Sequence, residues 1–213
     1  PTQEVNSIFD DKPTLKDPKQ GALLQEIKNN FWLPEDQEEY LYLEPELLWT
    51  DGDEVKSITG SEMPAIWNGM RTFLSTMKNN SNIGRNLNFL IRDKKTKKLL
   101  GVTCMSSDFL DLTPRDNYIG WERVAKTQRM INHTCIGSTI VPIQPLGYNL
   151  VGGKLLALLC LSDTVEKTWE YQYKDKLVGV TTTSLYGKTK EIPLSKYDRL
   201  KYWKKIVWTA GSL

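Results

Sequence analysis

The sequence contains few of the residues that identify a function class directly. It has one histidine, His133, and three cysteines, Cys104, Cys135 and Cys160, which lie far apart. Secreted disulfide scaffolds carry paired cysteines at close spacing, so we expect these three to be reduced and buried. With 213 residues the chain can bury a hydrophobic core without a disulfide or a structural metal.

Long apolar runs are also missing. The longest, residues 155–161, is far below the roughly 20 residues that cross a bilayer, and no charged-then-apolar signal opens the chain. We therefore expect a soluble, cytoplasmic protein with no membrane partner. The sequence leaves its oligomeric state open.

The net charge of +2 conceals an asymmetry along the chain. Residues 1–84 carry 7 Lys and Arg against 15 Asp and Glu, a net of −8, whereas residues 85–213 carry 21 against 11, a net of +10. A basic segment of this size attracts partners that bear phosphate, such as a nucleotide cofactor or a nucleic acid. A solvated lysine surface is the alternative interpretation.

Residues 1–84 are predicted to form an acidic, helical N-terminal part. A polar lead-in over residues 1–20 precedes one or two helices within residues 21–50, which Pro34 and Pro45 interrupt. Apolar residues at helical spacing predict a further helix over residues 63–77: Ile66, Met70, Phe73, Leu74 and Met77.

Residues 85–213 are predicted to form a separate, basic domain with alternating strands and helices. Two β-type runs joined by a lysine-rich turn predict a hairpin. The expected strands are residues 86–92, 99–105, 134–141 and 176–183, and the expected helices are residues 121–131, 150–173 and 196–206. The fold class is therefore α+β, with a mixed, mostly antiparallel sheet flanked by helices.

One segment, residues 141–156, has the outline of a phosphate cradle. A strand ends at prolines, a glycine-containing turn follows, and a helix begins whose free N–H groups and positive dipole end suit a pyrophosphate. It matches neither the Walker A loop, since Leu155 follows Lys154, nor the dinucleotide fingerprint, since the glycines are wrongly spaced. A plain turn with glycines for close packing is the alternative.

This order of elements resembles the GNAT acyltransferase fold. In that family a splayed strand and the loop after it hold coenzyme A, so the resemblance implies acetyl-CoA or another acyl-CoA as cofactor. By resemblance the binding positions are Ile140, Val141, Gly147, Gly152, Gly153 and Lys154. The family often has a tyrosine on its last helix that protonates the leaving thiolate, and Tyr202 stands there. An amphipathic anchor is the other role open to Tyr202.

A second resemblance covers residues 85–185. The motif Tyr118-Ile119-Gly120-Trp121, followed by Asn132-His133-Thr134, resembles the domain shared by the DruA protein of Druantia anti-phage systems and its phage and bacterial relatives. The chain is also similar, more distantly, to GNAT-like DNA-modification enzymes of the phage Mom type. These resemblances imply a bacterial or phage-infected cell and a nucleic-acid substrate.

Other side chains are candidates for chemistry. His133 is the side chain that would titrate near neutrality unperturbed, and it serves either as a base or as hydrogen-bonded structure. Ser184 follows the last strand and is a candidate for a pocket lining, without an evident acid and base partner. The three aspartates Asp108, Asp111 and Asp116 form either a base or metal site or, as we prefer, a solvated loop.

The C-terminal segment mixes cations with aromatic rings, a combination that neutralises phosphates and stacks on bases. Its candidate nucleic-acid contacts are Lys188, Lys190, Arg199, Lys201, Lys204 and Lys205. An amphipathic helix with a lysine-rich outer face is the bland alternative. Two functions follow: an acyl-CoA-dependent transferase acting on a nucleic-acid base, or a non-catalytic nucleic-acid-binding or phage assembly protein on the same fold.

Overall fold

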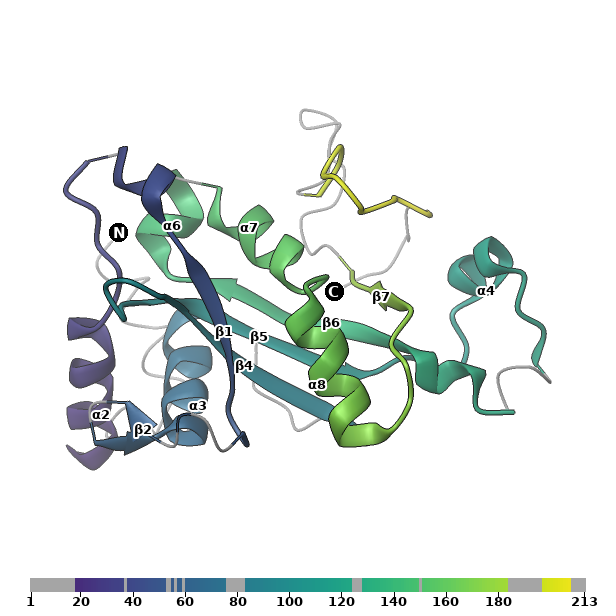
Figure 1. The fold of residues 1–213 in the computed structure, drawn as a ribbon, viewed down its shortest axis with the longest axis horizontal. Helices are drawn as coiled ribbons and strands as arrows, with labels where there is room; N and C mark the ends of the chain where they lie inside the picture. Colours follow the sequence, from purple (N-terminus) through teal and green to yellow (C-terminus); the bar gives the residue numbers. More distant parts are fainter. Residues whose placement is uncertain are drawn as a thin grey trace, which may run out of the picture. The chain divides into compact units, whose positions relative to one another are not determined.

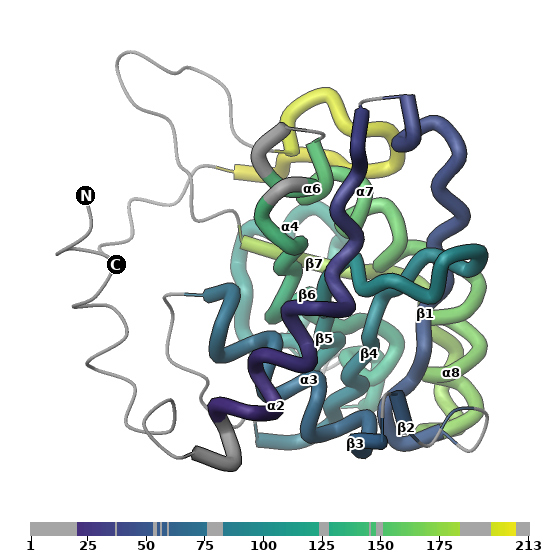
Figure 2. Tube along the Cα trace, turned by 90° about the vertical axis from the view of Figure 1, so that its left-hand side faces the viewer, coloured from purple at the N-terminus to yellow at the C-terminus, as the bar shows by residue number. Residues whose placement is uncertain are grey.

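The protein has a mixed α+β fold built on a mostly antiparallel open sheet flanked by helices, seen in the computed structural model in Figure 1. The structure describes residues 18–36, 38–52, 55, 57–58, 60–75, 83–123, 128–149, 151–183 and 197–207. The strand order is β1-β4-β5-β6-β7, which can be followed across the sheet in Figure 2. These strands are β1 (Pro45–Trp49), β4 (Asn86–Asp93), β5 (Leu99–Ser107), β6 (Thr134–Pro142) and β7 (Gly179–Thr181).

The strand pairs include one hairpin and two pairs of strands that lie further apart in the sequence. The predicted hairpin is confirmed: β4 and β5 are joined by a tight turn in which the N–H of Asp93 donates to the carbonyl of Lys98, 2.8 Å away. β1 runs antiparallel to β4, with Leu48 opposite Leu90. β7 runs parallel to β6, and Cys135 lies opposite Val180. Parallel strands need a long connection, which the helices between β6 and β7 provide.

The chain divides into two compact units, the first made of residues 1–81, 87–104 and 139–153. Within it, α2 (Pro18–Asn29) and α3 (Met63–Leu74) lie side by side in Figures 1 and 2. Gly69 permits this approach, because a Cβ there would come within 2.7 Å of the Ile27 side chain. The unit also contains η2 (Glu38–Tyr42), β2 (Ser57–Ile58), β3 (Ser61–Glu62) and α6 (Gln144–Asn149).

The second unit comprises residues 82–86, 105–138 and 154–213. Its helices are α4 (Thr113–Ile119), η3 (Met130–His133), α7 (Gly152–Leu159) and α8 (Asp163–Tyr173). Helix α8 is held by specific polar contacts. The Tyr173 hydroxyl accepts from the N–H of Asn86 and donates to its carbonyl, and the indole N–H of Trp169 donates to the carbonyl of Asn132.

The single helix predicted over residues 150–173 is wrong. Val151 has a φ of 57°, a left-handed conformation that separates α6 from α7, and the chain turns again before Ser162. Ser162 is the N-cap of α8 and acidic side chains occupy its first turn, so α8 begins as a new helix. Continuous apolar character indicated burial correctly but gave no sign of these two breaks.

Other predicted elements need correction. Residues 21–50 contain strand β1 as well as helix, because a proline is tolerated as the first residue of a strand. Helix α4 was not predicted, and the helix predicted over residues 196–206 is absent from its described part, residues 197–206, which forms turns. The predicted domain boundary near residue 84 stays a prediction.

The predictions about the cysteines and about membrane-spanning segments can be compared with the structure directly. All three cysteines are free and buried, as expected. Within the described segments, none of the helices is both long and apolar enough to cross a membrane.

Candidate functional site

The predicted phosphate cradle is filled by the chain itself. A Cβ on Gly152 would lie 2.4 Å from Cγ of Leu146 and 2.8 Å from the Leu146 carbonyl oxygen, so Gly152 is small because Leu146 packs against it. Gly147 lies in the short helix α6, and a Cβ on it would be 3.1 Å from Cγ of Pro142. The glycines thus serve helix packing.

The remaining predicted cofactor positions lie on β6 and at the start of α7. Ile140 and Val141 are half-buried on β6, Gly153 is buried, and Lys154 is half-buried in the first turn of α7. Because Leu146 covers Gly152 and both glycines that begin α7 are buried, these residues do not fit a coenzyme A pyrophosphate. We derive no step through that cofactor.

Among the predicted catalytic side chains that the structure describes, no hydrogen bond or ring contact joins His133 to Tyr202. His133 is the last residue of η3, directly before β6. Its Nδ1 lies 2.8 Å from the carbonyl oxygen of Lys176. Since a carbonyl only accepts, Nδ1 carries the proton of this hydrogen bond. Tyr202 is 77% exposed on a turn, with the Lys201 ammonium 4.8 Å from its ring centre. Ser184 lies outside the described residues.

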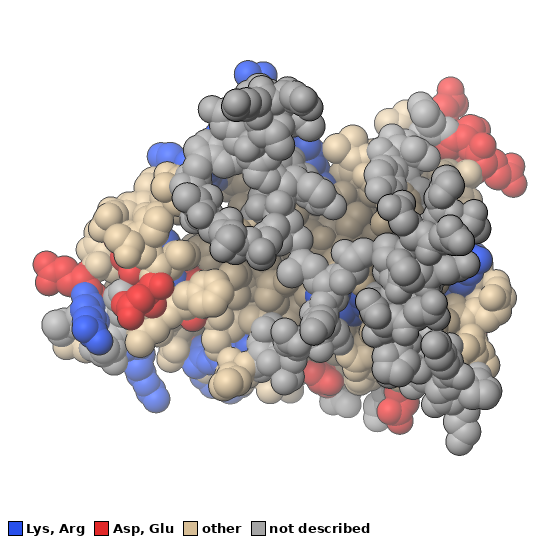
Figure 3. Space-filling view, turned by 180° about the vertical axis from the view of Figure 1, so that it is seen from behind, with Lys and Arg blue, Asp and Glu red and all other residues tan. Residues whose placement is uncertain are grey.

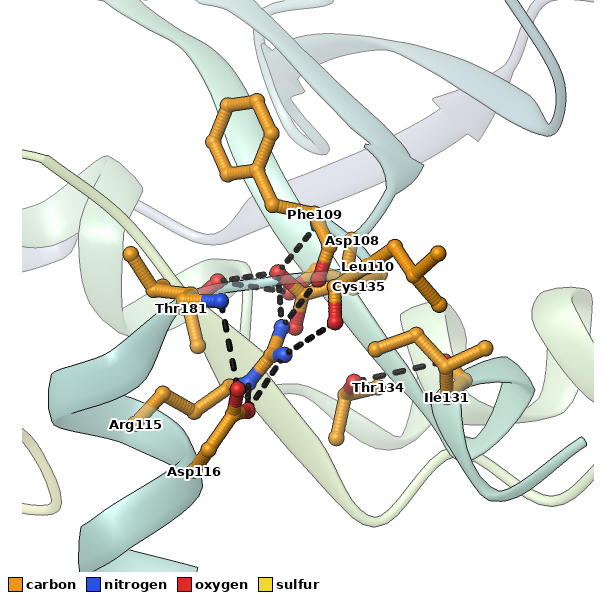
Figure 4. Close-up of polar contacts among 10 residues, drawn as sticks. Asp108, Phe109, Leu110, Arg115, Asp116, Ile131, Thr134, Cys135 and Thr181 are labelled. Atoms are coloured by element: carbon orange, nitrogen blue, oxygen red, sulfur yellow. Dashed lines mark hydrogen bonds and ion pairs between the residues drawn. The ribbon is translucent and has the colours of Figure 1, made fainter. Parts of the chain in front are cut away.

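The most elaborate polar cluster of the second unit surrounds Arg115 (Figure 4). Its side chain is 1% exposed and its guanidinium forms ion pairs with Oδ1 of Asp108 at 2.8 Å and Oδ1 of Asp116 at 2.6 Å. It also donates to the carbonyl of Phe109 at 2.8 Å and reaches that of Leu110 at 3.5 Å. Arg115 therefore fixes the chain between the end of β5 and α4.

Two carboxylates pair with this guanidinium, whose side chain is buried. Asp108 is fully buried at its side chain, and its Oδ1 also accepts from Thr181 of β7 at 3.1 Å. Its Oδ2 is buried without a hydrogen-bond partner among the described residues. The preferred interpretation of a solvated loop is therefore wrong for Asp108 and Asp116, because Arg115 draws both inward. Nor do the described residues gather three metal-ligand side chains.

The first of the two sequence motifs noted above contributes to this cluster, and the second fixes the start of β6. Gly120 caps α4 in the left-handed conformation, with φ of 79°, and its N–H donates to the carbonyl of Asp116. The cap turns the chain so that Trp121 covers Arg115, whose guanidinium carbon lies 5.5 Å from the indole. In the second motif, Thr134 donates through Oγ1 to the carbonyl of Ile131 and fixes the start of β6.

An apolar surface is exposed around the cluster. Phe109, Leu110, Tyr118 and Ile119 are each between 42% and 55% exposed, although all four side chains are large and apolar or aromatic. The Lys204 ammonium lies 4.7 Å from the ring centre of Tyr118. We call these five residues the α4 surface.

Of the α4 surface, the sequence predicted only Lys204 as a nucleic-acid contact, although Tyr118 and Ile119 stand in the motif that resembles the family. A helix-start signal was available, because Thr113-Pro114 places a proline in the first turn, where its missing N–H costs nothing. The other predicted nucleic-acid contacts differ in whether they are paired, exposed or described at all. Lys205 pairs with Asp198 at 3.1 Å, Arg199 and Lys201 are exposed, and Lys188 and Lys190 lie outside the described residues.

On the face that Figure 3 shows, the described charges do not gather into one basic patch. Figure 3 shows the described Lys and Arg side chains of the pictured face scattered among acidic ones. The net charge of +10 in residues 85–213 therefore does not by itself define a binding surface. A surface that combines aromatic rings with a cation, such as the α4 surface, is a more specific sign of nucleic-acid binding than net charge is.

The comparisons with known proteins identify a family. A sequence model of the family described as Druantia protein DruA matches residues 54–212. The Druantia protein DruA of Escherichia coli (strain UMEA 4076-1) is 31% identical over 143 residues, which are 62% of this chain and 35% of that relative. The chain thus spans about a third of the relative's length. No solved structure matches. The chain belongs to the DruA family.

Proposed function

We propose that this member of the DruA family acts in defence against phage by binding nucleic acid on the α4 surface, without coenzyme A. The observation that carries the proposal is the Lys204 ammonium 4.7 Å from the ring centre of Tyr118, which is 55% exposed. A cation neutralises a phosphate, and an aromatic face stacks on a base. Single-stranded nucleic acid offers both groups at once.

Arg115 supports this proposal by holding the surface in place. The guanidinium binds the carbonyls of Phe109 and Leu110, whose side chains are half-exposed, and the carboxylate of Asp116 on α4. Rings that are fixed before binding lose less conformational freedom when a base stacks on them. A buried ion cluster under an exposed apolar surface is consistent with that need.

The test is fluorescence anisotropy with a labelled single-stranded DNA of about 16 nucleotides. Tyr118→Ala should weaken binding by about 1–3 kcal/mol, the cost of one base stack. Lys204→Ala should lower the slope of log affinity against log salt by about 0.7, one phosphate contact. The duplex of the same sequence should bind more weakly, because its bases are not available for stacking.

Matched controls come from a similar pair on α8, where the Lys174 ammonium lies 4.9 Å from the Tyr171 ring. Tyr171→Ala and Lys174→Ala should leave DNA affinity unchanged. No saturable binding of DNA or RNA at low salt would refute the proposal, and so would equal losses in the two pairs.

The transferase is the second candidate, and the strand topology favours it. The parallel β6–β7 ladder has three residue pairs, ending at Ile136 and Thr181, after which Thr182 reaches the carbonyl of Gly137 through its hydroxyl at 3.0 Å. Parallel strands that diverge are what the GNAT resemblance leads us to expect. This candidate predicts saturable calorimetric binding of acetyl-CoA at a place other than the turn at Gly152, so Lys154→Ala should leave that binding unchanged. Gly152→Glu is unsuitable as its control because Leu146 fills that space.

A further inference from the structure

A loop of the first unit displays large apolar side chains among acids. In residues 33–44, Leu33, Leu41 and Tyr42 are 62%, 77% and 68% exposed. The same residues include five acids and no Lys or Arg. We call this segment the acidic loop.

The acidic loop is anchored on both sides. Before it, the N–H of Trp32 donates to the carbonyl of Leu99 at 2.9 Å. At its end, the N–H of Glu44 donates to Oδ1 of Asp93 at 2.9 Å, and the Glu44 carboxylate pairs with Lys95 at 2.7 Å. The segment with the exposed side chains is therefore held at both ends by hydrogen bonds to β5 and β4.

The loop is also shaped from within. The Asp36 carboxylate accepts from the N–H groups of Glu38 and Glu39, at 2.8 and 3.1 Å, and so caps η2. Leu41 and Tyr42 lie in that helix. Among the described residues, Glu35, Glu38 and Glu39 have no ion-pair partner, so their charges face solvent or a ligand.

From this arrangement we propose that the acidic loop is a docking surface for a protein segment that carries Lys or Arg beside apolar side chains. The exposed leucines and tyrosine would bury apolar area, and the unpaired glutamates would meet the cations of the partner. The family match begins at residue 54, so the surface lies in a part of the chain outside the shared region. It is independent of the α4 surface and of nucleic-acid binding.

The experiment uses the full chain and a labelled amphipathic peptide of about 18 residues, five helical turns, with leucines on one face and lysines on the other. The control peptide has the same composition in scrambled order. We expect saturable binding that Leu41→Ser with Tyr42→Ser weakens about tenfold or more, because two exposed apolar contacts are lost. Glu35→Gln with Glu38→Gln should weaken it as well, and more so at low salt.

Tyr171→Ser serves as the matched control, since Tyr171 is 67% exposed in the second unit. Circular dichroism melts establish that each variant is folded. The proposal is overturned if the peptide does not bind, if the scrambled peptide binds equally, or if the double serine variant binds as the parent does. A self-association in sedimentation that the serine variant abolishes would overturn it too, by assigning the loop to a second copy. DNA binding is measured on the same samples, so each proposal fails separately.

Discussion

Replacing Arg115 is the sharpest test of the buried cluster. Arg115→Met preserves much of the side-chain volume but removes the guanidinium that pairs with Asp108 and Asp116, whose side chains are 0% and 10% exposed. Removing one partner of a buried ion pair typically costs about 3–5 kcal/mol, because the remaining charge stays desolvated. We expect a loss of that size in the free energy of unfolding.

Replacing Asp108, an ion-pair partner of Arg115, should lower the free energy of unfolding by less than replacing Arg115 does. In Asp108→Asn, the Oδ1 position can still accept from Arg115 and Thr181, and the amide nitrogen occupies the position of Oδ2, which has no described hydrogen-bond partner. We expect a loss of about 1 kcal/mol. The double variant should be more stable than the sum of the two losses predicts, by about 0.5–3 kcal/mol, because the asparagine side chain leaves no uncompensated charge at position 108.

Urea unfolding followed by tryptophan fluorescence measures all three variants. Lys95→Met is the control, since its ion pair with Glu44 is more than half exposed on both sides and should barely matter. A loss below about 1 kcal/mol in Arg115→Met, or strict additivity in the double variant, would refute the reasoning.

Two further predictions concern packing and pH in the first unit. Gly152→Ala should lower stability by about 1–3 kcal/mol, because its Cβ would overlap Leu146, whereas Gly21→Ala in α2 meets no atom within 4 Å and should not destabilise; thermal melts compare them. Burial acts to raise the pKa of Asp93, but hydrogen bonds from Glu44 and Thr96 lower it below its usual 3.8. This stabilisation is present above the unfolded pKa and is lost as pH falls through the folded one, so Asp93→Asn should be less stable at pH 7 but lose less stability on acidification below about pH 4. An identical melting curve against pH in the variant would contradict that account.

The sequence by itself determined the α+β class, the β4–β5 hairpin, strand β6, helix α3 and the buried free cysteines. These features depend on local periodicity and turn chemistry, which a run of neighbouring residues carries in full. The motifs around Gly120 and Thr134 could be recognised for the same reason. Their physical purpose could not, since it depends on Arg115 and Trp121 meeting in space.

Tertiary structure decided the rest. Only packing reveals that Leu146 fills the turn at Gly152, which sequence spacing had suggested as a cradle. Likewise an aspartate in a polar loop is predicted to face solvent, unless the fold turns a cation toward it and makes burial favourable, as α4 does by directing Arg115 at Asp108. Exposure of apolar residues such as Tyr118 and Leu41 also depends on which neighbours arrive from elsewhere in the chain. Leu146 and Gly152, like Asp108 and Arg115, are close in sequence, but whether their side chains meet depends on the turns between them, which the residue pattern does not specify.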